Sequence, residues 1–91
     1  MSENKAYDRL FEVAKRGTGQ SEDVAEFLLA WYNVRAWGGW APHRIYGLDR
    51  AIREDILSVL RAISQSLWYP DSDDMYQLIE MYRAGESELV E

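Results

Sequence analysis

The chain has 91 residues, a net charge of −6 and no cysteine, and 13% of its residues are aromatic. This length fits one domain, and a domain of this size depends on a few large rings to complete its core. The lack of cysteine excludes disulfides, thiolate metal ligands and cysteine nucleophiles. Met1-Ser2-Glu3 is too polar to begin a signal peptide, and the longest apolar run covers only residues 27–32. We therefore predict a cytoplasmic protein with no membrane partner.

The charge is distributed unevenly along the chain. Residues 1–70 hold nine acids and nine bases, whereas residues 71–91 hold seven acids and a single base, Arg83. This balance disfavours direct nucleic-acid binding, which depends on Lys and Arg contacts to phosphate. The acidic end suits a protein partner with a basic surface, or it is only a solvated tail.

Two helices are predicted in the first part of the chain from apolar residues that recur with a 3.6-residue period. The first covers residues 2–16 and ends at Gly17, because glycine commonly follows the last helical residue. The second has Ser21 as its N-cap and ends near Ala36, because two glycines follow. Its stripe consists of Val24, Phe27, Leu28, Trp31, Tyr32 and Arg35.

The second part of the chain predicts two more helices. The third starts at Leu48 or Asp49 and ends before residues 68–71. Its apolar stripe is Ile52, Ile56, Val59, Leu60, Ile63 and Leu67, and its wet side holds Arg50, Arg53, Glu54 and Arg61. The fourth begins after residues 71–74 and ends at Gly85, which leaves 86–91 as an acidic tail. Without any strand pattern, residues 1–85 are predicted to form an all-α domain, a compact bundle of about four helices.

The residue pattern offers little for catalysis or metal binding. His43 is the only histidine, so a multi-histidine metal site is excluded and a triad has no visible partner. The glycines at 17 and 19 do not form a phosphate loop, because neither a preceding strand nor a third glycine is present. The acids at 71, 73 and 74 lack the glycine of a calcium loop and fit helix capping better. We predict no enzyme, no catalytic residue, no cofactor and no metal.

The most informative stretch is the aromatic loop of residues 37–47, between the second and third predicted helices, in which Pro42 can open one short helical turn. Trp, Tyr and Arg dominate binding hot spots. The candidate partner-binding residues are therefore Trp37, Trp40, Arg44 and Tyr46 here, with Asp71, Asp73 and Asp74 as a second, acidic group. The alternative is that the two tryptophans plug the open end between the helices, because aromatic rings readily complete a small core.

Several short blocks occur in a fixed order along the chain. They are Thr18-Gly19-Gln20, residues 27–33, Trp37-Gly38-Gly39-Trp40, residues 48–52 and Tyr69-Pro70-Asp71. In this order they resemble a family of small bacterial proteins carried on plasmids, integrative elements and prophages. The resemblance covers most of residues 10–82. It implies a mobile-element setting and carries over no catalytic residue.

Two functions follow from these observations. The first is a non-enzymatic protein–protein interaction protein of a mobile element or phage, in its sharpest form an inhibitor of host defence that resembles anti-CRISPR proteins. The alternative is a homodimeric structural or regulatory module of the element with no defence role, because small bundles often complete their cores by dimerising.

Overall fold

The computed structural model describes residues 5–66 and 68–90, and their side chains as far as Arg83. Its elements are α1 (Lys5–Lys15), α2 (Ser21–Trp37), the 3₁₀ helix η1 (Pro42–Gly47), α3 (Arg50–Gln65) and α4 (Ser72–Val90). No strand occurs in this part of the chain. The predicted all-α bundle of about four helices is therefore confirmed, as is the short helical turn that Pro42 opens.

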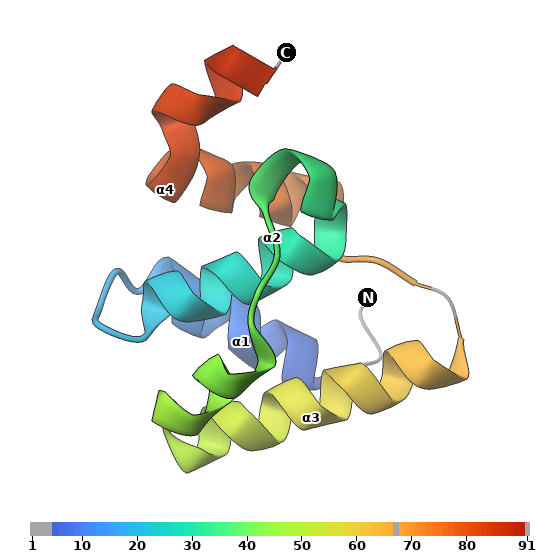
Figure 1. Ribbon diagram of the computed structural model, residues 1–91. Coiled ribbons are helices and arrows are strands. Elements are labelled where there is room, and N and C mark those ends of the chain that lie inside the picture. Colours follow the sequence, from blue (N-terminus) through green and yellow to red (C-terminus); the bar gives the residue numbers. More distant parts are fainter. Residues whose placement is uncertain (1–4, 67, 91) are drawn as a thin grey trace.

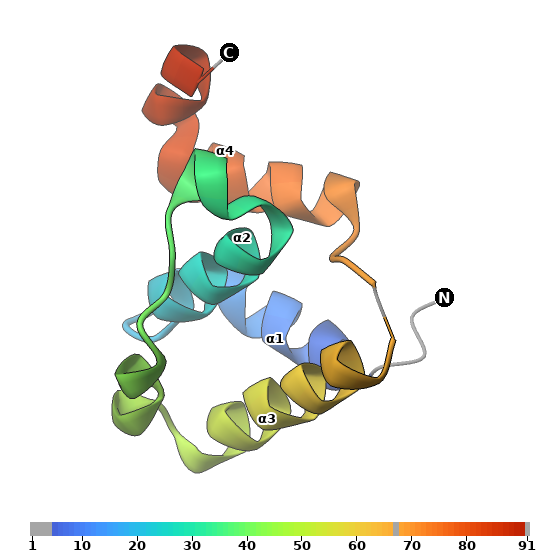
Figure 2. The same ribbon diagram turned by 45° about the vertical axis from the view of Figure 1, so that its right-hand side comes forward.

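The helices are arranged around α1 and α2. Figures 1 and 2 show α3 and α4 on opposite sides of this central pair. Helix α1 packs against α2, α3 and α4, and α2 also packs against α4. The core consists of Ala6, Tyr7, Leu10, Phe11, Ala14, Val24, Ala25, Phe27, Leu28, Leu29, Leu48, Ile56, Val59, Met75, Leu78 and Ile79.

Aromatic rings join three separate parts of the bundle at one place. The rings of Trp31, on α2, and Trp68, in the segment before α4, are 4.8 Å apart at an interplanar angle of 88°. Tyr7 of α1 meets each of these indoles edge-on, at 6.1 Å. Edge-to-face pairs add stabilisation beyond the area that they bury, so this cluster fixes the segment before α4 to the central helix pair.

The turn between α1 and α2 is only partly as predicted. Gly17 follows α1 with a φ of +74°, a conformation that favours glycine. The predicted N-cap at Ser21 is wrong, because Gln20 takes that position and Ser21 is the first helical residue. The buried Ser21 hydroxyl instead points back into the turn, where it accepts a hydrogen bond from the Thr18 N–H at 3.1 Å. The side chain therefore closes the turn rather than capping the helix.

Helix α2 contains a break that the periodicity does not reveal. Asn33 has φ −160° and ψ 88°, outside the helical region. Its side-chain oxygen accepts a hydrogen bond from the Ala36 N–H at 3.2 Å, which is the geometry of an N-cap. One further turn follows, so α2 ends at Trp37. The chain then reverses at Gly38, whose φ of 88° an L side chain rarely adopts.

Helix α4 begins at Ser72, earlier than the predicted start after residue 74, and it ends later than predicted. The Asp71 side chain accepts hydrogen bonds from the N–H groups of Asp73 (2.8 Å) and Asp74 (3.2 Å) and so caps the helix. The helix passes through Gly85 to Val90, with non-helical angles at Arg83. A single glycine costs about 1 kcal/mol in a helix and does not by itself stop it. The side chains of the predicted acidic tail, 86–91, lie outside the described residues.

Candidate functional site

The segment that follows α2 is held against the start of that helix by Trp40 and Arg44. The Trp40 indole N–H donates to the Asp23 carbonyl oxygen at 3.0 Å, and its ring meets Phe27 at 5.2 Å. Arg44 forms ion pairs with Asp23 and, at 2.7 Å, with Glu26. Its guanidinium also lies 5.7 Å from the centre of the Trp40 ring. Both residues therefore bind within the chain.

Glu26 lies at the centre of an ion-pair network that joins three elements. It pairs with Arg44 of η1 and, at 3.3 Å, with Arg83 of α4. The hydrogen bond to Glu26, opposed by partial burial and assisted by Asp23, raises the pKa of Arg44 above its ordinary value. The network fixes η1 to α2 and connects it to the opposite side of the bundle.

The other two predicted residues of the loop, Trp37 and Tyr46, differ in their exposure to solvent. Trp37, like Trp40, is partly buried and packs against the core, in agreement with the alternative that the two tryptophans complete the core. Tyr46, by contrast, is 86% exposed. The four predicted residues Trp37, Trp40, Arg44 and Tyr46 thus do not form one free surface, because two of them are engaged by α2 and one packs on the core.

The predicted acidic group has structural partners as well. Asp71 caps α4, and Asp74 accepts a hydrogen bond from the Tyr7 hydroxyl at 2.8 Å, while Asp73 is exposed. The Tyr7 hydroxyl in turn accepts the Asp71 N–H at 3.3 Å. Burial, followed by the hydrogen bond to Asp74, raises the pKa of Tyr7 well above its ordinary value. Asp71 and Asp74 therefore fasten α4 to α1.

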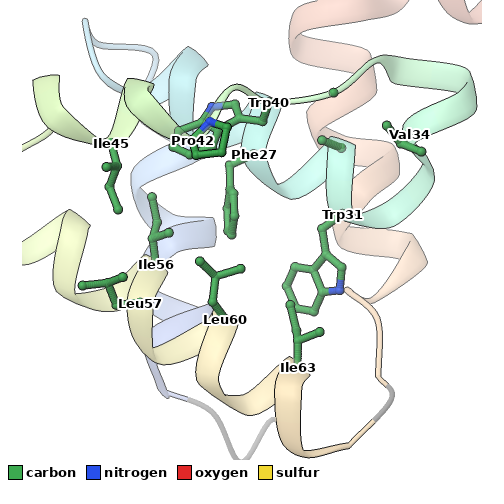
Figure 3. Close-up of a pocket in the computed structure, with 12 residues that line it drawn as sticks. Phe27, Trp31, Val34, Trp40, Pro42, Ile45, Ile56, Leu57, Leu60 and Ile63 are labelled. Carbon is green, nitrogen blue, oxygen red and sulfur yellow. The ribbon is translucent and has the colours of Figure 1, made fainter.

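An apolar groove of about 520 Å³ lies between α2, the segment 39–45 and α3. In Figure 3, Phe27 and Trp31 of α2 point toward the isoleucine and leucine side chains of α3, and Pro42 and Ile45 lie at one end. The lining residues are Phe27, Ala30, Trp31, Val34, Gly39, Trp40, Pro42, Ile45, Ile56, Leu57, Leu60 and Ile63.

The walls of the groove are exposed to solvent, whereas its floor is buried. Val34, Leu57 and Leu60 are 54%, 49% and 45% exposed. At the floor, Phe27 and Ile56 are 6% and 0% exposed. Contiguous apolar surface of this kind commonly marks a site of interaction with another molecule. The groove is thus the candidate functional site of the described part of the chain.

The groove offers hydrophobic contact and no reactive group. None of the described residues that line it is titratable, and both of its indole N–H groups already have partners. Trp31 donates to the Trp68 carbonyl oxygen at 3.2 Å, and Trp40 donates to Asp23. Catalysis needs a nucleophile, an acid or a base at the reacting centre. The groove is therefore suited to burying apolar side chains.

Only part of the groove was predicted from the sequence. Trp40 was predicted as a binding residue, and it lines the groove with its ring. Leu57 and Val34 were not predicted as site residues, although both are apolar residues outside the predicted stripes. Val34 and Leu57 could have been found as apolar side chains outside the predicted stripes. Leu60 could not, because it belongs to the predicted apolar stripe of the third helix, and the structure leaves it 45% exposed.

The one histidine of the sequence does not line the groove. His43 lies in η1 and is exposed, and no hydrogen bond or ion pair joins its side chain to another described residue. No group of three or more His, Cys, Asp or Glu side chains among the described residues could hold a metal ion. Over the same part of the chain, no helix has both the length and the hydrophobicity to cross a membrane.

The chain belongs to a family of unknown function (DUF7673), whose model matches residues 4–86. No curated protein and no solved structure matches it. The family match supports the predicted membership of a family without an assigned activity. The setting on plasmids, integrative elements or prophages stays a prediction.

Proposed function

We propose that this member of the family acts as a non-enzymatic interaction protein and binds a partner protein in the groove between α2 and α3. The observation that carries this proposal is the exposure of Val34, Leu57 and Leu60 beside a buried apolar floor. Covering apolar surface releases about 25 cal/mol per Å². A partner that fills the groove gains this free energy without reorganising the bundle.

The lining supports a macromolecular partner rather than a small molecule. Sites for small molecules combine apolar walls with a few polar groups that orient the ligand. In this groove the polar atoms of Trp31 and Trp40 are engaged by backbone carbonyl groups. A protein segment needs no such groups inside the groove, because its apolar side chains enter and its polar groups stay at the rim.

A photocrosslinking experiment tests this function. A benzophenone amino acid is placed at Leu57, in the groove, or at Tyr76, which is 58% exposed on α4 across the bundle. In a lysate of the native host we expect a discrete protein adduct from position 57 that position 76 does not give. Adding Leu60→Glu should abolish the adduct. Adducts of equal yield at both positions, or an adduct that Leu60→Glu leaves intact, would contradict the proposal.

The mobile-element setting and the inhibition of host defence belong to the same proposal. They rest on the ordered sequence blocks and on the small, acidic character of the chain, and they imply a partner with a basic surface for the acidic end. Titration of the protein onto a CRISPR surveillance complex tests the defence role. Unchanged target-DNA binding at saturating protein would exclude inhibition at that step.

The alternative proposal is a homodimeric module in which a second copy covers the groove. The exposed leucines favour it to the same degree as they favour a foreign partner. Sedimentation discriminates between the two, because a dimer dissociates on dilution and a monomer does not. A monomer at all concentrations would contradict the homodimer.

A further inference from the structure

Three arginines follow the outer edge of α3 along the groove. Arg53 lies one helical turn before Leu57, and Arg61 lies one turn after it. Residues four positions apart lie on the same face of a helix. Arg50 continues the row by a further turn toward the start of α3. Leu57 lines the groove, so this arginine row, Arg50, Arg53 and Arg61, borders its wall.

The charge of the arginine row is not neutralised by the described residues. The ion pairs of this part of the chain engage Arg9, Lys15, Arg44 and Arg83, and none of them involves the row. Among the acids near the groove, Asp23 and Glu26 are bound by Arg44, and Asp55 on α3 is bound by Arg9 at 2.8 Å.

Two exposed acids near the row reduce its charge without cancelling it. Glu54 lies on the side of the row away from the groove, and Asp49 precedes α3. The backbone N–H of Asp49 donates to the Gln20 side chain at 2.7 Å. The border of the groove is therefore positive, although the whole chain carries a net charge of −6.

The dimensions of the groove suit a helical partner. Its α3 wall extends from Ile56 to Ile63, which at 1.5 Å per residue is about 10 Å, or two turns. A partner helix presents apolar anchors at positions i, i+3 or i+4, and i+7 over the same distance. The described residues include no strand whose edge could accept an extended peptide.

We propose that the groove binds an amphipathic α-helix of a partner protein, whose apolar stripe enters the groove and whose flanking residues are acidic and pair with Arg53 and Arg61. This inference rests on the proposed function and adds the chemistry of the partner. The guanidinium group can bind a carboxylate through two parallel hydrogen bonds, which fixes orientation as well as sign. A basic flank would face the arginine row with like charge and be rejected.

Three peptides test the inference with the full chain. Each is a labelled helical peptide of about 14 residues with the same leucine stripe, and its flanks are glutamate, glutamine or lysine. Binding is measured by fluorescence anisotropy at low and high salt. We expect the glutamate peptide to bind about tenfold more tightly than the lysine peptide at low salt, with a smaller difference at high salt.

Variants of the protein locate the effect. The double variant Arg53→Glu, Arg61→Glu should reverse the order of the glutamate and lysine peptides. The matched control Arg16→Glu changes an exposed arginine outside α3 that has no ion pair with a described residue, and it should leave the order unchanged. Leu60→Glu should abolish binding of all three peptides. Thermal melts followed by circular dichroism verify that each variant is folded.

The results that would contradict the inference can be distinguished from those that would contradict the proposed function. Lysine-flanked binding as tight as glutamate-flanked binding, or an order that the double variant leaves unchanged, refutes the acidic partner. If Leu60→Glu still abolishes that binding, the groove function survives. If none of the three peptides binds, the helical partner is refuted. The photocrosslinking experiment at position 57 still tests the groove function independently. A dimer that Leu57→Glu dissociates identifies a second copy as the occupant and refutes the inference.

Discussion

Gly38 and Gly39 are neighbours in the sequence, yet only the first has a backbone conformation that requires glycine. Gly38 has a φ of 88° and a ψ of 169°, a region that is nearly closed to other residues. Gly39 has no positive φ, and the nearest atom to an added Cβ would be Val34 Cγ2 at an ordinary 3.9 Å. The reversal after α2 therefore depends on one glycine.

The two glycines make a matched pair for mutation. We expect Gly38→Ala to lower the free energy of unfolding by about 1–3 kcal/mol, because the alanine Cβ strains this backbone conformation. Gly39→Ala should change it by less than about 1 kcal/mol, since alanine fits there and restricts the unfolded chain. Urea unfolding of both variants measures the difference. Equal losses would show that the reversal at Gly38 is not the cause.

Tyr7 predicts a dependence of stability on alkaline pH. Its pKa is raised in the folded chain by burial and by Asp74, so in the unfolded chain it releases its proton first, near pH 10. Above that pH the unfolded state binds fewer protons, and stability falls as pH rises. The contribution of Tyr7 is at most about 1.4 kcal/mol per pH unit, which is the limit for one proton.

Unfolding measurements between about pH 9 and pH 11 check this expectation. Tyr7→Phe should be less stable at neutral pH, because Asp74 and the Asp71 N–H lose a partner, and its stability should fall less steeply with pH. Tyr46→Phe is the control, since Tyr46 is 86% exposed and should retain the steeper fall. An unchanged slope in Tyr7→Phe would contradict the assignment.

At the scale of the elements, ion pairs connect the segment that contains η1 to α2. Arg44 connects η1 to two acids of α2, and it is itself only 30% exposed. Replacement by methionine retains most of the apolar stem and removes the guanidinium. Trp40 and the packing of Ile45 would then remain to hold the segment.

We expect Arg44→Met to reduce stability by about 1 kcal/mol and to speed hydrogen exchange in residues 38–47. The difference in stability between the wild type and Arg44→Met should become smaller as salt is added, because salt screens the ion pairs of Arg44 in the wild type. Arg16→Met serves as control, since no ion pair joins the exposed Arg16 to a described residue. Exchange rates that are unchanged in Arg44→Met would show that the ion pairs do not hold the segment.

Elements with a strong local signal were predictable, and those fixed by distant contacts were not. The α3 stripe placed Ile56 and Val59 in the core, and both are fully buried. The break at Asn33 could not be predicted from the sequence, because asparagine also occurs on the surface of unbroken helices. Here its side chain accepts a hydrogen bond from the Ala36 N–H instead. The end of α2, by contrast, was predicted near Ala36 from the two glycines that follow, and the helix ends at Trp37.

At the scale of the whole molecule, we expect one leucine to stabilise the core and two others to bind the partner. Leu28 is fully buried in the core, whereas Leu57 and Leu60 are 49% and 45% exposed in the groove. Leu28→Ala should cost about 2–5 kcal/mol, because it leaves a cavity. Leu57→Gln and Leu60→Gln should each cost about 1 kcal/mol or less, as partly exposed positions lose little burial.

Denaturant unfolding combined with the peptide titration checks this separation. The two glutamine variants should remain folded and lose peptide binding. Losses of stability as large as that of Leu28→Ala would mean that the groove leucines belong to the core.

The bundle could be predicted from the sequence, but the groove could not. Each helix carries its own periodic signal, so the class of fold is readable from local pattern. The groove is formed by residues 27–34, 39–45 and 56–63, which meet only after folding. Arg44 looked like a contact for a partner because its own partners, Asp23 and Glu26, lie 21 and 18 positions away in the sequence.

The perpendicular pair of Trp31 and Trp68 provides a spectroscopic signal for one step of folding, the docking of the segment before α4 on α2. Two indoles 4.8 Å apart at an interplanar angle of 88° are close enough for their electronic transitions to couple, and we expect a pair of bands of opposite sign in far-ultraviolet circular dichroism. Trp68→Phe should remove the pair of bands, while Trp40→Phe should retain it. Because the two rings meet only when the segment before α4 has docked on α2, the intensity of this signal during refolding would time that docking separately from helix formation.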